Sequence, residues 1–313
     1  DRFAPEYVFI TPEAELVKTR EARGSAYIDF EVNEIDINPR YRRNPEELQK
    51  IRGTIDIIRN DGDTRIVAVT IEGFASPEGP YAENERLAKG RTEALRNYVR
   101  GLYTFDPSIM RSSWVAENWD GLRKYVADSD LADKNGILAV IDAENLEPDA
   151  REWKLKNAYP EQYRFLLDNV YPALRNSDYT VEYVVRSYTD IEEIKAVMKS
   201  APQKLSLHEM YAVAQSLETG SDEYREVFEV AVRMYPDDPA ANLNAANIAL
   251  GRNELDRAAG YLAKAGDTPE AAYARGILAA KSGDYDRAAR AFGDAATRGV
   301  KQAADAAAML RES

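Results

Sequence analysis

The last third of the chain repeats a pattern of small and apolar residues every 30 to 32 positions. Each unit has a glycine, then an aromatic residue or leucine, then a small or apolar residue: Gly220, Tyr224, Val227; Gly251, Leu255, Ala258; Gly283, Tyr285, Ala288. Positions 240–308 also contain 24 alanines. Small residues let two helices approach closely, and a glycine fits the tight turn between them. The period therefore predicts a stack of paired helices.

The proline-rich stretch at 234–239 (Met-Tyr-Pro-Asp-Asp-Pro) matches the end of one such unit. On these features, the segment resembles the tetratricopeptide repeats, although its period is a few residues short of their usual 34 or so. The resemblance implies an all-α domain over 200–313, with about three repeats and a capping helix at 301–311. His208 is expected in a helix of the first repeat. Such a domain would present a surface to protein partners.

The first 190 residues have a different pattern, in which strands and helices alternate. Period-two segments and the apolar run at 65–71 predict strands, whereas apolar residues at helical spacing predict helices. The expected order is strand 26–33, helix 44–60, strand 65–71, helix 82–102, strand 112–117, helices over 119–176, and strand 179–185. The run at 65–71 is apolar on both faces, which is typical of a central strand covered by helices. We predict an α/β sandwich over 25–190 with a mixed four-stranded sheet, a helical insertion at about 119–177 and an N-terminal extension at 1–24.

Composition excludes several classes of function. The net charge of −13 would repel nucleic-acid phosphates. Cysteine is absent and His208 is the only histidine, so thiol chemistry and zinc sites built on several histidines are excluded. Nucleotide-binding and serine-hydrolase motifs are also absent. We therefore expect a protein that is not an enzyme and has no metal or cofactor.

One motif stands where the second strand leads into the second helix, which is a usual ligand position in α/β sheets. It is Gly73-Phe74-Ala75-Ser76-Pro77-Glu78-Gly79, followed by Asn84, Leu87, Ala88 and Arg91. With Phe30, Asn33 and Pro39, this motif resembles the OmpA-like peptidoglycan-associating domain, over roughly 25–118 with a closing strand at 179–188. The turn and the segment 117–122 are similar to the form found in Bacteroides-type envelope proteins.

The resemblance implies a ligand and a set of binding residues. In that family, an aspartate in the turn binds the ammonium of diaminopimelate in the peptidoglycan stem peptide, and a helix arginine binds its carboxylate. Arg91 and Asn84 match the family arginine and asparagine, and Asn33 matches the early loop. Ser76 replaces the aspartate, which removes a charged contact worth about 1.5–3 kcal/mol. Glu78, two residues on, is a candidate for the missing charge.

Two other interpretations of these residues stay open: Arg91 could pair with an acidic residue of its own domain, and Ser76 and Glu78 could be turn and N-cap residues only. The sequence therefore predicts a non-catalytic protein of the periplasm or the outer-membrane-associated envelope. Its first domain would bind peptidoglycan, and its repeats would bind envelope proteins. The alternative is a protein–protein scaffold, or a fimbria-related assembly factor, whose OmpA-like domain no longer binds peptidoglycan.

Overall fold

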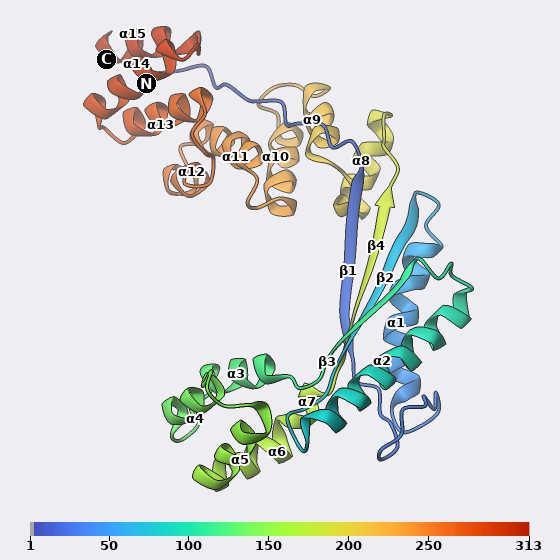
Figure 1. The fold of residues 1–313 in the computed structure, drawn as a ribbon. Coiled ribbons are helices and arrows are strands. Elements are labelled where there is room, and N and C mark those ends of the chain that lie inside the picture. The colour runs from blue at the N-terminus through green and yellow to red at the C-terminus, as the bar shows by residue number, and fades with distance from the viewer. Residues whose placement is uncertain (1–2, 313) are drawn as a thin grey trace. The chain divides into compact units, whose positions relative to one another are not determined.

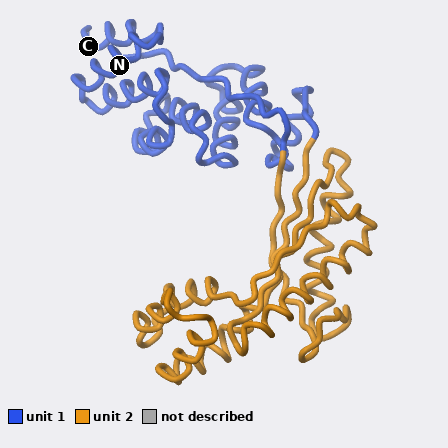
Figure 2. The backbone as a smooth tube through the Cα atoms, in the orientation of Figure 1, with its two compact units in different colours: residues 1–18, 186–313 blue, residues 19–185 orange. Residues whose placement is uncertain are grey.

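The computed structural model describes residues 3–312, and the chain forms two compact units (Figure 2). Thr19–Val185 form one of them, called here the α/β unit. Asp1–Lys18 and Arg186–Ser313 form the other, called here the helical unit. The predicted N-terminal extension at 1–24 is thus divided between the two units, and its first two residues lie outside the described part of the chain.

A four-stranded mixed sheet lies at the centre of the α/β unit, in the order β1-β4-β2-β3 (Figure 1). The strands are β1 Lys18–Ala26, β2 Thr64–Phe74, β3 Met110–Val115 and β4 Ser177–Val185. β2 runs parallel to β3 and antiparallel to β4, with a register shift between Ile66 and Ala68. The predicted mixture of helices with a mixed four-stranded sheet is confirmed.

Two helices, α1 (Asn44–Arg59) and α2 (Tyr81–Tyr103), lie beside this sheet (Figure 1). α1 begins at Asn44, the predicted first residue, and buries apolar residues at helical spacing: Leu48, Ile51, Ile55 and Ile58. β2 is a central strand of the sheet, as predicted. Buried and half-buried side chains mostly alternate along it, however, whereas the prediction had helices covering both faces. Val67, Thr70 and Glu72 stay half-buried, while Ala68, Val69 and Ile71 are buried.

The first strand was predicted in the wrong place. It lies at Lys18–Ala26, and 27–33 form a loop. The Asn44 side chain accepts a hydrogen bond from the Asp29 N–H (2.7 Å) and donates one to the Asp29 carbonyl (2.9 Å), and Asn33 has φ +62°. These bonds take the place of a strand ladder. The true strand lies at the sheet edge and is rich in charged residues, so it lacks the apolar alternation that marks a half-buried strand.

The insertion between β3 and β4 is helical, as predicted. Its helices are α3 Trp119–Asp128, α4 Lys134–Ile141, α5 Pro148–Ala158, α6 Pro160–Asn169 and α7 Tyr171–Leu174. They bury an apolar cluster of their own that includes Leu122, Ile137, Leu155, Leu166 and Tyr171. This separate core fixes the helices beside the Ser76 turn.

The described residues from 186 onward form helices without any strand. They are α8 Ile191–Ser200, the short 3-10 helix Pro202–Lys204, α9 Leu207–Gln215, α10 Asp222–Met234, α11 Pro239–Gly251, α12 Leu255–Leu262, α13 Pro269–Lys281, α14 Tyr285–Thr297 and α15 Gln302–Glu312. His208 lies in α9, and α15 falls at the predicted capping helix. The core of α11–α15 is mostly alanine, with Tyr273 and Phe292 as its largest fully buried side chains.

The repeated glycines do not all form turns. Gly220 and Gly283 have φ +84°, a conformation that favours glycine. Gly251 is the last residue of α11, and Asn253 adopts the positive φ of +58° two residues later. The prediction that Gly251 supplies a turn is therefore wrong, because asparagine tolerates the left-handed conformation and takes that role here.

Gly73, the first residue of the motif, allows α2 to pack closely on β2. A Cβ at this position would overlap the hydroxyl of Thr92 on α2. We expect Gly73→Ala to lower the free energy of unfolding of the α/β unit by about 1–3 kcal/mol, as for other overpacked cores. Trp114, Trp119 and Trp153 all lie in this unit, so denaturation followed by tryptophan fluorescence measures it alone.

The matched control is Gly62→Ala, because a Cβ at Gly62 would meet nothing within 4 Å. We expect it to stay within about 0.5 kcal/mol of wild type. Equal stabilities of the Gly73 and Gly62 variants would show that α2 can move away from the sheet at no cost.

Candidate functional site

The motif turn connects β2 to α2, and the helical insertion holds it from outside. Glu152 of α5 accepts a hydrogen bond from the Gly79 N–H (3.1 Å), and Asp149 accepts one from the Tyr81 N–H (2.9 Å). The N-cap of α2 is Pro80, and no side chain of that residue caps the helix. The interpretation of Ser76 and Glu78 as N-cap residues is therefore wrong, since acidic side chains of α5 bind these N–H groups instead.

Arg175, which sequence reasoning did not single out, joins the two turn residues. Its Nε donates to the Ser76 hydroxyl (3.0 Å), and its Nη2 donates to Glu78 Oε2 (3.1 Å). Ser76 is 5% exposed, whereas the Glu78 and Arg175 side chains are 50% and 44% exposed. The serine hydroxyl is thus already bound within the protein, while the Glu78 carboxylate still faces solvent.

Asn84 has a structural position on α2. It is buried, and its Nδ2 donates to the Glu78 carbonyl (2.9 Å) and to Glu117 Oε2 (2.7 Å). The other oxygen of Glu117 accepts from Trp119 Nε1 (2.9 Å). Asn84 therefore fixes the turn from beneath and does not face a ligand with Arg91.

Glu117 is a buried carboxylate, and this should make stability depend on pH. Burial raises its pKa; the hydrogen bonds from Asn84 and Trp119 lower it, and the charges of Glu152 and Asp149 raise it. A raised pKa means that the folded protein holds this proton to higher pH than the unfolded chain does. Ionisation of Glu117 therefore costs stability as pH rises from the unfolded pKa through the folded one.

Glu117→Gln should remove this dependence. The glutamine amide replaces one hydrogen-bond acceptor by a donor, and this lowers the free energy of unfolding by an amount that does not depend on pH. The informative quantity is therefore the difference in free energy of unfolding between variant and wild type, measured as a function of pH. We expect that difference to move in favour of the variant as pH rises from about 4 to neutral, and then to level off. Tryptophan fluorescence during urea denaturation measures it. A difference that is flat with pH would mean that Glu117 is not perturbed by burial.

Arg91 is half-buried on α2 and keeps part of its guanidinium available. Its Nε donates to the Glu34 carbonyl (2.9 Å), and its guanidinium carbon lies 5.0 Å from the centre of the Phe30 ring. No acidic side chain among residues 3–312 pairs with it, so the interpretation of Arg91 as a partner of an acidic residue is wrong. Its two terminal nitrogens remain for another acceptor.

The charges around Arg91 favour an anion. Burial lowers the pKa of the Arg91 guanidinium, and the positive charges of Arg175 and Arg86 lower it further, against the opposite effect of Glu83. A carboxylate bound to Arg91 would offset this repulsion and could form the bidentate pair that a guanidinium fork makes with carboxylates. Glu78, which is bound to Arg175 and half exposed, is the anion that could accept an ammonium.

Asn33 does not meet the turn. It lies in the loop after β1, is exposed, and its carbonyl accepts from Arg86 Nη2 (3.4 Å). Its positive φ shows a role in shaping that loop. Of the predicted site residues, the structure joins Ser76 and Glu78 through Arg175. Asn84 donates to the backbone of the same turn, and the charge of Arg175 lowers the pKa of Arg91.

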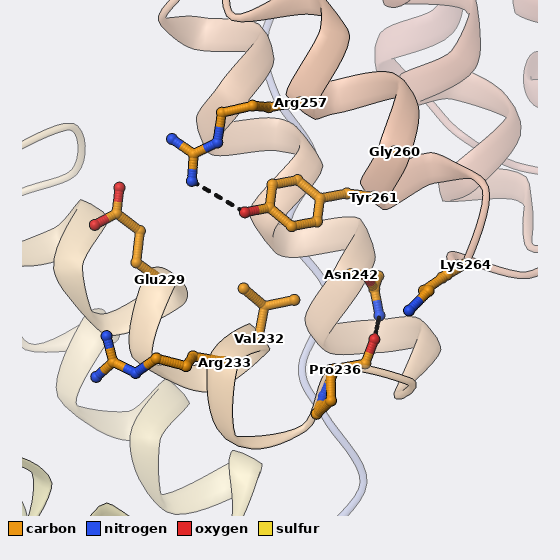
Figure 3. Close-up of a pocket in the computed structure, with 9 residues that line it drawn as sticks. All are labelled: Glu229, Val232, Arg233, Pro236, Asn242, Arg257, Gly260, Tyr261 and Lys264. Atoms are coloured by element: carbon orange, nitrogen blue, oxygen red, sulfur yellow. Dashed lines mark hydrogen bonds between the residues drawn. The ribbon is translucent and has the colours of Figure 1, made fainter. Parts of the chain in front are cut away.

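A hollow of about 680 Å³ lies in the helical unit between α10 and the helices α11 and α12 (Figure 3). Three of its four charged side chains, Glu229, Arg257 and Lys264, pair with residues outside its lining. Arg257 donates to Glu254 (2.9 Å) and to the Tyr261 hydroxyl (3.1 Å), and Lys264 pairs with Asp237 (3.2 Å). The fourth, Arg233, has no hydrogen bond or ion pair among the described residues, and it lies at the side of α10 that lines this open surface hollow.

No protein-family model and no curated protein matches this chain. Within residues 3–312, no cluster of three or more histidine, cysteine or acidic side chains is arranged to hold a metal ion. In the same range, every helix is too short or too polar to cross a bilayer.

Proposed function

We propose that the protein is a non-catalytic component of the cell envelope, in the periplasm or at the outer membrane, whose α/β unit associates with peptidoglycan. The observation that carries this proposal is Arg91: its terminal nitrogens are unpaired among the described residues, beside the charge of Arg175. The position of the motif between β2 and α2 supports the OmpA-like assignment. The repeated helical pairs support the assignment of tetratricopeptide-like repeats that bind envelope proteins.

In this proposal Arg91 binds the carboxylate of the diaminopimelate residue. Glu78 takes the ammonium, since the Ser76 hydroxyl is neutral and already accepts from Arg175. The Glu78 carboxylate is shared with Arg175 and half exposed, so the ammonium would compete with an existing ion pair. Exposed pairs of this kind contribute about 0–1 kcal/mol, so the competition costs little.

Co-sedimentation with purified peptidoglycan sacculi tests the proposal. We expect the wild-type chain to pellet with sacculi and Arg91→Ala to remain in the supernatant. The matched control is Arg100→Ala in the last turn of the same helix, because its side chain is exposed and does not contribute to the charges around Arg91. If Arg91→Ala pellets as well as wild type, Arg91 is not the carboxylate-binding residue.

The second candidate is a protein–protein scaffold or a fimbria-related assembly factor. The bond between Arg175 and Ser76 favours it, because this bond uses the residue that replaces the family aspartate for internal support. This candidate would be favoured if the wild-type chain stays in the supernatant when sacculi are pelleted and still binds extracted envelope proteins.

A further inference from the structure

The N-terminal segment, residues 3–12, lies extended along the helices of the helical unit, although more than 200 positions separate the two in sequence (Figure 1). The helices contact it through residues of α10, α11, α13 and α14. These residues are called here the receiving face: Tyr224, Phe228, Asn244, Asn247, Tyr273 and Phe292.

The receiving face binds the main chain of this segment. The Asn244 side chain accepts from the Ile10 N–H (2.9 Å) and donates to the Ile10 carbonyl (2.9 Å). One helical turn later, Asn247 Nδ2 donates to the Val8 carbonyl (2.8 Å), and the Tyr273 hydroxyl donates to the Glu6 carbonyl (2.6 Å). Hydrogen bonds to backbone groups of alternate residues are how proteins bind an extended peptide with little dependence on its sequence.

Aromatic side chains add specificity at two points. The Phe9 ring lies 5.0 Å from Phe228 and 5.5 Å from Tyr224, and the Phe3 ring lies 6.4 Å from Phe292. These separations are typical of favourable aromatic pairs. The face therefore selects an extended segment with aromatic residues six positions apart.

The segment leaves one buried group of the receiving face unsatisfied. Asn247 is 2% exposed, yet its Oδ1 has no hydrogen-bond partner among the described residues. Asn244 uses both ends of its amide on one residue, whereas Asn247 uses only one end. A buried acceptor without a donor costs its desolvation energy, so a segment that supplied an N–H here would bind better.

We propose that the receiving face is a binding site for an extended apolar segment of a partner protein, and that residues 3–12 occupy it as a displaceable internal ligand. This deepens the proposed binding of proteins by the repeats and is independent of peptidoglycan. The partner segment carries aromatic residues spaced as Phe3 and Phe9 are, and a free backbone N–H for Asn247. The tethered segment competes at a high effective concentration, so the wild-type site is largely closed.

Fluorescence anisotropy of a labelled synthetic peptide with the sequence of residues 3–15 tests this proposal on the full-length chain. Phe9→Ser weakens the internal segment and leaves the receiving face intact. We expect this variant to bind the peptide at least tenfold more tightly than wild type does. Adding Asn244→Ala to Phe9→Ser should return binding to the wild-type level, because it removes both bonds to the Ile10 backbone.

Several results would overturn the proposal. One is a folded Phe9→Ser chain, by circular dichroism, that binds the peptide no better than wild type. Loss of helical structure in Phe9→Ser would make the segment an integral part of the core.

Hydrogen exchange gives a check without mutation: we expect the Ile10 amide to exchange faster than amides in the middle of α11. If the Ile10 amide exchanges only at the rate of global unfolding, the segment is not displaced from the receiving face. If wild type is a dimer and Phe9→Ser is a monomer, the receiving face binds a second copy of this chain and not a partner protein.

Discussion

Replacing Lys18 by alanine should lower the free energy of unfolding of the helical unit by about 3–5 kcal/mol. The Lys18 side chain is 2% exposed, and its ammonium lies 2.9 Å from Glu209 Oε1. It also donates to the Lys204 carbonyl (2.9 Å) and lies 4.3 Å from the centre of the Tyr188 ring. Removing the ammonium leaves a buried carboxylate without its counter-charge, which is costly because an uncompensated charge is poorly solvated in the protein interior.

The same carboxylate organises the start of α9. Glu209 accepts from the N–H groups of Ser206 (2.8 Å) and Tyr188 (2.6 Å), and with Ser206 it forms a capping box. A double variant, Lys18→Met with Glu209→Gln, should therefore be less destabilised than the sum of the single variants, because it leaves no unpaired charge.

Far-UV circular dichroism reports the helices of both units, whereas tryptophan fluorescence reports the α/β unit alone, since all tryptophans lie in that unit. In Lys18→Ala, we expect the dichroism transition to shift strongly and the fluorescence transition to shift less. Lys264→Ala is the control: its pair with Asp237 is exposed, so its removal should change stability by less than about 1 kcal/mol. Equal effects of the two lysine substitutions would mean that the Lys18 pair is not effectively buried.

Phe292→Ala should also destabilise the helical unit by about 3–5 kcal/mol. Phe292 is fully buried between α13 and α14, with its ring 5.6 Å from Tyr273. Gly276 leaves the space for this ring, because a Cβ there would lie 2.6 Å from it. Alanine would leave a cavity that close-packed helices cannot fill.

Tyr285 provides the control on the same helix. It is 58% exposed, and Tyr285→Ala should change stability by no more than about 0.5 kcal/mol. Thermal denaturation followed by circular dichroism compares the two variants. Similar melting curves for both would show that the core of α13 and α14 collapses around the lost ring.

Helices and buried strands of this fold could be predicted where the side chains themselves carry the pattern. α1 begins at Asn44 as predicted, and β4, Ser177–Val185, contains the range 179–185 that was predicted from its alternating residues. β1 could not be found, because an edge strand of charged residues has no apolar face to reveal it. Tyr224 and Tyr285 recur at repeat spacing, yet one is 8% exposed and the other 58% exposed. The burial of each tyrosine depends on which helices pack against it, and this cannot be read from the sequence of its own repeat.

The candidate site was predictable only in part for the same reason. The motif placed Ser76, Glu78 and Arg91 near the end of β2, since these residues are close in sequence. Arg175 is 99 positions from Ser76, in a segment without a recognisable motif, so only the fold brings them together. Asn84 matched a family position, but its place in the sequence did not indicate that its side chain would donate a hydrogen bond to Glu117, 33 positions away.

Calorimetric titration with a stem peptide that ends in diaminopimelate tests the central claim most directly. The wild-type chain should bind this peptide, and Arg91→Ala should bind it at least tenfold more weakly, since a charge-assisted hydrogen bond is worth about 1.5–3 kcal/mol. Amidation of the diaminopimelate carboxylate should weaken wild-type binding by a similar factor and leave Arg91→Ala unchanged. Equal affinity of wild type and Arg91→Ala for the unmodified peptide, or no binding by wild type at millimolar concentration, would contradict the account.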